Sequence, residues 1–213
     1  MAMLCTLSDV KTLLGIPLDD LSKDSILTLL IKQASADIEG YLGYTLSMAE
    51  YVDEVHCANY RQIIQLNHFP LRSVSSVTAN GVEITDYKIL PEYARWGNLY
   101  RGYGWGSGAY LRGFTNDVVA GMWNIEVTYM AGYYLPGDTG YTEGAENSLP
   151  YDISAVCMRL VEQAYLYKES GAVGLKAHSE GHISDTYGDN ASAIGLSEDA
   201  KKALARYVWV GLA

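Results

Sequence analysis

The chain has 213 residues, 49% of them hydrophobic and 19% charged, which is typical of a globular protein with a sizeable buried core. Fifteen basic against 25 acidic residues give a formal net charge of −10, which argues against phosphate-backbone binding as the main activity. No run approaches the roughly 20 apolar residues of a membrane helix, so we expect no membrane partner. The three cysteines, Cys5, Cys57 and Cys157, lack CxxC spacing and are interpreted as buried free thiols.

Two helices are predicted at the beginning of the chain. Thr6 and Asp9 have the spacing of a capping box, and Gly15 is placed to end the short helix that follows them. Within residues 22–42, apolar side chains recur at intervals of three and four and therefore form one stripe of a longer helix, with Ser22 as the expected cap. We expect these two helices to pack against each other at a corner.

After residue 48 the apolar period changes from that of a helix to that of strands. The predicted strands are residues 51–55, 62–66, 73–79, 82–84, 87–90 and 123–129. Asn80-Gly81 separates two of them and is a strong signal for a tight hairpin. His56 and His68 are interpreted as isolated strand histidines. The short connections predict an antiparallel meander or a small barrel.

Residues 97–121 contain seven glycines interspersed with aromatic side chains. One interpretation is a projecting loop that grips a partner through the aromatic residues Tyr100, Tyr103, Trp105 and Tyr110. The other is a long connection whose aromatic residues fold back onto the sheet. The sequence leaves both open.

The C-terminal part returns to helical periodicity. Pro150 precedes a predicted helix over residues 151–170, whose apolar stripe is the natural partner of the stripe within residues 22–42. Residues 171–196 are polar and lack periodicity, and a last helix is expected from Ser197 to about residue 209.

These elements predict an α+β fold, in which N- and C-terminal helices form a helical bundle with an inserted antiparallel β-meander or small barrel. The expected domains are residues 1–48 plus 148–213 (helical), 49–135 (antiparallel β, with the Gly/Tyr-rich loop 97–121), and a linker over 136–147.

No motif predicts catalysis. GxSxG, HExxH and phosphate-loop patterns are missing from the sequence, and the acidic residues are scattered, so we expect no enzyme and no cofactor. His178, His182 and Asp185 could be considered as metal ligands, but Gly181 and the loop composition argue against a rigid site, and we expect none.

The order of several short motifs resembles the tailed-phage head–tail connector family, also called adaptor or head-completion proteins. Each motif is unspecific alone, and the resemblance lies in their succession along nearly the whole chain. The motifs are LSDVKTLLGI (7–16), ADIEGYLG (36–43), IIQLNHFPLRSVSSVTANGVEI (63–84), DYKI (86–89), NIEVTYMAGY (124–133), the helix after Pro150, and ISDTYGD (183–189). Residues 97–121 and 137–147 look longer than their counterparts in the family.

The resemblance implies a bacteriophage virion protein of the neck, assembled in the host cytoplasm. It would form a closed ring with further copies of itself, expected to be a dodecamer. Its other partners would be the portal protein and a stopper or tail-completion protein. DNA would pass through the ring without specific binding. The candidate interface residues are Tyr100, Tyr103, Trp105, Tyr110, Ile183, Asp185, Tyr187 and Asp189. Residues 171–196 have the composition of an arm that orders on contact.

Two other classes of function remain open at this point. A carbohydrate- or peptide-binding module would use the aromatic residues of the 97–121 loop, and replacing Trp105 by alanine would then abolish binding with little effect on stability. A hydrolase with an unrecognised site is disfavoured, because no nucleophile and base are grouped in the sequence.

Overall fold

The computed structural model describes residues 3–106, 123–169, 177–180, 183–186 and 196–208. It divides the chain into two compact units. The helical unit comprises Met1–Gly43 and Tyr134–Ala213, and the β unit comprises Tyr44–Tyr133. Helices and antiparallel sheets occur together, so the predicted α+β class is confirmed. None of the helices in the described ranges has the length and apolar content required to span a membrane.

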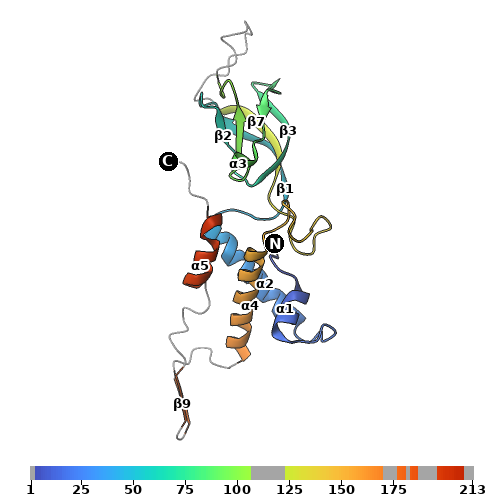
Figure 1. The fold of residues 1–213 in the computed structure, drawn as a ribbon, viewed down its shortest axis with the longest axis vertical. Helices are drawn as coiled ribbons and strands as arrows, with labels where there is room; N and C mark the ends of the chain where they lie inside the picture. Colours follow the sequence, from blue (N-terminus) through green and yellow to red (C-terminus); the bar gives the residue numbers. More distant parts are fainter. Residues whose placement is uncertain (1–2, 107–122, 170–176, 181–182, 187–195, 209–213) are drawn as a thin grey trace. The chain divides into compact units, whose positions relative to one another are not determined.

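The helical unit is built around α2 and α4, which lie side by side (Figure 1). The short α1 contacts both of them, and α5 packs on α4. The bounds are α1 Leu7–Leu14, α2 Asp24–Leu42, α4 Tyr151–Glu169, α5 Glu198–Leu204 and the 3₁₀ turn η2 Ala205–Tyr207.

The contact between α2 and α4 follows from the apolar stripes of the two helices. Leu27, Ile31 and Ile38 of α2 are completely buried, as are Ile153 and Val161 of α4. A buried aliphatic side chain of this size contributes about 1.5–3 kcal/mol relative to exposure. The two stripes, although more than 100 residues apart in the sequence, therefore hold the unit together.

The start of α2 differs from the prediction. Its first residue is Asp24 and its N-cap residue is Lys23, which makes no side-chain cap, whereas Ser22 was expected to cap it. The Asp24 carboxylate instead pairs with Lys11 of α1, whose Nζ lies 2.5 Å away and is almost fully buried. Lys11 Nζ also donates to the carbonyl oxygens of Leu18 and Asp20, 3.2 and 2.9 Å away. One buried lysine thus fixes the turn between the two helices.

The β unit contains two antiparallel sheets (Figure 1). A four-stranded sheet has the order β1-β7-β3-β4, and a three-stranded sheet has the order β2-β6-β5. The bounds are β1 Ala49–Cys57, β2 Ile63–Gln65, β3 Leu71–Ala79, β4 Val82–Glu83, β5 Tyr87–Lys88, α3 Pro91–Ala94, β6 Asn98–Arg101 and β7 Trp123–Ala131.

The sheets are not closed into a barrel, which corrects the small-barrel alternative. Within the described residues, strands pair only inside their own sheet, and β4 at one edge contributes just two residues. The position of β7 between β1 and β3 also departs from a simple meander, in which neighbours in sequence are neighbours in the sheet.

The strongest strand and turn signals agree with the structure. Ile125, Val127 and Tyr129 of β7 alternate into the core and are completely buried. Asn80 and Gly81 have φ angles of 51° and 75° and join β3 to β4, as a type I′ hairpin turn requires.

A two-stranded hairpin lies where the sequence shows no periodicity. Strands β8 (Ala177–Glu180) and β9 (Ile183–Thr186) pair antiparallel, with His178 opposite Asp185. The irregular alternation of polar and apolar residues explains why this segment was expected to lack regular structure.

Candidate functional site

The beginning of the Gly/Tyr-rich segment is folded into the core of the β unit. We call residues 98–106, from β6 to Gly106, the stem. Trp105 of the stem is completely buried, and its Nε1 donates to the carbonyl oxygen of Leu99 over 3.2 Å. At Trp105 the structure therefore matches the interpretation in which the aromatic residues fold back onto the sheet.

Arg101 fixes the stem electrostatically. It is 8% exposed, and its Nε donates to Asp86 Oδ1 over 2.8 Å. The guanidinium also donates to the carbonyl oxygen of Gly104 over 3.4 Å and lies 5.8 Å from the centroid of the Trp105 ring. This pairing could not be predicted from the sequence, because Asp86 lies 15 residues before Arg101, in an exposed stretch between β4 and β5.

The other candidate interface residues of the segment have different environments. Tyr103 is 65% exposed, and Tyr100 is half-buried in β6. Tyr110 lies outside the described residues. The stem therefore presents Tyr103 to solvent from a backbone that is held by Arg101.

The remaining candidates belong to the C-terminal segment. Ile183 and Asp185 are in β9, where their backbones pair with Glu180 and His178 of β8. Tyr187 and Asp189 lie outside the described residues.

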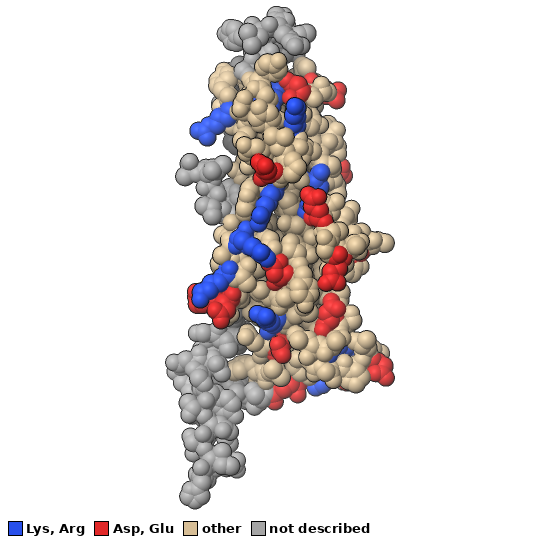
Figure 2. All heavy atoms as spheres, in the orientation of Figure 1, with Lys and Arg blue, Asp and Glu red and all other residues tan. Residues whose placement is uncertain are grey.

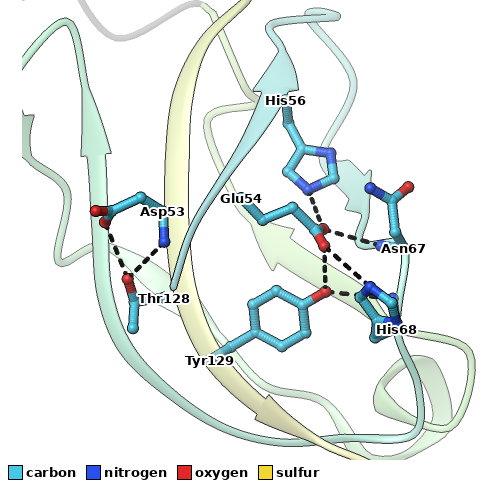
Figure 3. A network of polar contacts seen from close by, with 7 residues as sticks. All are labelled: Asp53, Glu54, His56, Asn67, His68, Thr128 and Tyr129. Atoms are coloured by element: carbon cyan, nitrogen blue, oxygen red, sulfur yellow. Dashed lines mark hydrogen bonds and ion pairs between the residues drawn. The ribbon is translucent and has the colours of Figure 1, made fainter. Parts of the chain in front are cut away.

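A polar network inside the β unit joins residues that are far apart in the sequence (Figure 3). Glu54 Oε1 lies 2.6 Å from His56 Nε2 and accepts from the backbone N–H of Asn67 over 3.0 Å. Glu54 Oε2 accepts from the Tyr129 hydroxyl over 2.9 Å and lies 3.7 Å from His68 Nε2. His56 and His68, expected to be isolated, thus share one carboxylate.

These contacts shift the pKa values of the network. Burial raises the pKa of Glu54, but the hydrogen bonds from His56, Asn67 and Tyr129 outweigh burial and bring it down to about 2. Burial, reinforced by the Glu54 carboxylate, raises the pKa of Tyr129. Burial lowers the pKa of His68, and the negative charge of Glu54 opposes that effect.

The network is suited to holding structure rather than to catalysis. Both oxygens of Glu54 are occupied by donors, so the carboxylate is not available to accept a proton from a substrate.

Next to Glu54, β1 forms a bulge in which Asp53 has a φ of 50° and donates its N–H to Thr128 Oγ1 over 3.0 Å. Over the ranges that the structure describes, no three His, Cys, Asp or Glu side chains are grouped to hold a metal ion.

Both units expose large apolar side chains, which are candidates for contacts with partner proteins. Those of the helical unit are Leu13, Leu18, Leu21, Leu29, Tyr151 and Leu166, and those of the β unit are Val52, Val55, Tyr60, Val82, Ile89, Tyr93 and Tyr103. On the face shown in Figure 2, uncharged residues cover most of the surface, and basic side chains lie close to acidic ones. This composition suits protein–protein contacts better than phosphate binding.

Comparison with known proteins adds a family match at the N-terminal end. Residues 5–80 match the sequence model of a family described as phage gp6-like head-tail connector protein. The predicted resemblance to head–tail connectors is confirmed. The matched residues include α1, α2 and the first three strands. Head–tail connectors are structural proteins, in agreement with the expectation that the chain is not an enzyme. None of the curated protein sequences matches this chain.

Chains in three solved structures have a fold similar to that of this chain. A chain from the neck of an empty gene transfer agent (GTA) particle, computed with C6 symmetry, is 16% identical with a TM-score of 0.52, and the match covers 100% of this chain and 95% of that chain. A chain from the neck of a native GTA particle, computed with C12 symmetry, is 14% identical with a TM-score of 0.50, and the match covers 100% and 94%. A chain from the virion of the native particle is 16% identical, with a TM-score of 0.51 and coverage of 99% and 92%. At these identities the similarity establishes the fold.

Proposed function

We propose that this protein is a subunit of a ring-shaped head–tail connector in the neck of a phage-like virion. In this function it docks below the portal, extends the DNA channel and provides the attachment site for a stopper or tail protein. The observation that supports the proposal most is the fold match over the whole chain to chains from GTA necks, which were computed with C6 and C12 symmetry. The family match over residues 5–80 points in the same direction.

A closed ring requires a heterologous interface, in which one face of each subunit meets a different face of the next. The exposed apolar side chains of the two units provide candidate contacts for such faces, since burying them between copies removes apolar surface from water. The net charge of −10 suits a channel through which DNA passes, because acidic side chains repel phosphates.

Among the candidate interface residues, Tyr103 has the strongest structural support. Its side chain is 65% exposed on a backbone that is already held, so a partner that covers it has to order the side chain but not the backbone. Tyr100, Tyr110, Ile183, Asp185, Tyr187 and Asp189 remain candidates. Trp105 is left out of the proposed interface because its ring is already buried inside the β unit.

Native mass spectrometry and negative-stain imaging of the chain with a purified portal from the same virus test the proposal. We expect several copies bound to each portal and a ring visible on the portal axis. Tyr103→Ala should weaken the assembly, whereas Tyr103→Phe, which keeps the ring, should retain it. Failure of the unaltered chain to associate with the portal or with itself under any condition would contradict the proposal.

A carbohydrate- or peptide-binding module is the second class considered from the sequence. It would use the aromatic residues Tyr100, Tyr103, Trp105 and Tyr110, and the burial of Trp105 removes the largest of these side chains from any binding surface. We therefore do not advance it as a second function.

A further inference from the structure

Two thiols meet in the core of the helical unit. The Cys5 thiol donates a hydrogen bond to Cys157 Sγ, and the two sulfur atoms are 3.5 Å apart. Cys5 directly precedes the cap of α1, and Cys157 lies within α4, so 152 residues separate them in the sequence. Both are buried, with exposed fractions of 1% and 0%. The fold, rather than the local chain, brings these groups together.

The backbone on either side of Cys5 is held in place. Before it, the N–H of Leu4 donates to Ser35 Oγ of α2 over 3.0 Å. After it, Thr6 forms the capping box of α1 with Asp9. Ser35 Oγ also lies 3.7 Å from Cys157 Sγ, so the serine joins the two sides of the pair. The position of Cys5 is thus held by contacts of its neighbours Leu4 and Thr6, and Ser35 contacts the Cys157 sulfur itself.

We propose that Cys5 and Cys157 form a latent disulfide, which is reduced in the cytosol and closes when the protein meets an oxidising medium. A disulfide bond is about 2.05 Å long, so the sulfur atoms have to approach by about 1.5 Å. Rotation about the Cys5 side chain and a small shift of the short segment before α1 supply such a movement. Cys57, which is half-buried in β1 of the other unit, is the thiol left over.

Closing the bond takes an oxidant, for which a small disulfide such as oxidised glutathione serves. The Cys157 thiolate attacks one sulfur of glutathione disulfide and expels a glutathione thiolate, which takes up the proton that Cys157 released. The Cys5 thiolate then attacks the Cys157 sulfur of the mixed disulfide and expels the second glutathione thiolate, which takes up the proton of Cys5. Two protein thiols are oxidised and one glutathione disulfide is reduced to two thiols.

The hydrogen bond between the thiols favours this order of attack. The bond from Cys5 lowers the pKa of Cys157, and the same bond raises the pKa of Cys5. Because both sulfur atoms are buried, the oxidant reaches them through local opening of the segment before α1. For the connector, and resting on the proposed function, release of the particle from the reducing cytosol is the event that permits oxidation.

The test measures disulfide formation in the unaltered full-length chain. The chain is equilibrated in mixtures of reduced and oxidised glutathione, both in native buffer and in urea. It is then quenched with acid and alkylated, and its peptides are mapped by mass spectrometry. We expect a Cys5–Cys157 linked peptide and an equilibrium constant about 100-fold larger in the folded than in the unfolded chain. The oxidised protein should melt about 8 °C higher than the reduced protein.

Two variants serve as controls. Cys57→Ser should keep the linked peptide, whereas Cys157→Ser should lose it. An equilibrium constant no larger in native buffer than in urea would overturn the proposal, as would linked peptides that contain Cys57 in place of Cys5 or Cys157. The measurement needs no portal protein, so its failure would leave the proposed connector function untouched.

Discussion

Replacing Lys11 by methionine should strongly destabilise the helical unit. The side chain of Lys11 is 3% exposed, pairs with Asp24 and donates to two carbonyl oxygens of the turn between α1 and α2. Methionine fills a similar volume, so the change removes the charge and its hydrogen bonds and leaves little cavity. The Asp24 carboxylate is then left without its cation at the start of α2.

The magnitude follows from the burial of the two partners. Breaking a buried ion pair by removing one partner costs about 3–5 kcal/mol, and the lower end applies because the Asp24 side chain keeps 28% exposure. A loss of about 3 kcal/mol corresponds to a fall of about 6–12 °C in the thermal midpoint of a chain of this size. The double variant Lys11→Met/Asp24→Asn should recover about 1–2 kcal/mol, because the unpaired charge is gone.

Circular dichroism at 222 nm during heating and urea titration measures this loss. Lys23→Met is the matched control, since Lys23 pairs with Glu169 over 3.3 Å at an exposed position and should leave the midpoint nearly unchanged. If Lys11→Met unfolds at the same temperature as Lys23→Met, the buried pair does not hold the turn between α1 and α2.

The remaining predictions concern the β unit. Glu54→Gln should lower the free energy of unfolding by about 3 kcal/mol at neutral pH, since the pKa of Glu54 is lowered from 4.5 to about 2 in the folded protein. In the unaltered protein this contribution is complete above pH 4.5 and is lost as the pH falls towards 2. In urea titrations between these pH values, the free energy of unfolding should therefore fall less steeply for the variant than for the unaltered protein. Trp105→Ala should cost about 3–5 kcal/mol in the same titrations, because the ring is fully buried; an unchanged midpoint would contradict its place in the core. Gly132→Ala should lower the thermal midpoint by about 5 °C or more, because Gly132 has a φ of 107° and an added Cβ would collide with the Ser47 carbonyl. A midpoint equal to that of the unaltered chain would show that the backbone at this position moves without cost.

Strong periodicity made the long elements predictable from the sequence. The stripe within residues 22–42 and the alternation after residue 123 each bury one face, and they correspond to α2 and β7. Strand β6 was missed because it has only four residues and lies inside the Gly-rich segment 97–121, and its neighbours β2 and β5 are also very short. Local signals identify an element only when enough residues share its period.

The polar network and the thiol pair could not be predicted, because their members lie far apart in the sequence. Glu54 and Tyr129 are separated by 75 residues, and Cys5 and Cys157 by 152. Only the pairing of β1 with β7, and the packing of α1 on α4, brings them into contact. Trp105 is a different case, since its Gly-rich context left both exposure and burial open and the structure buries the side chain.

Electron cryo-microscopy of the chain bound to its portal tests the proposed connector function most directly. We expect a closed ring of copies on the portal axis, below the portal, with an open channel through its centre. The helices and sheets of each unit should fit the density of every copy. Copies scattered singly over the portal, or a portal that carries no copy of the chain at saturating concentration, would contradict it.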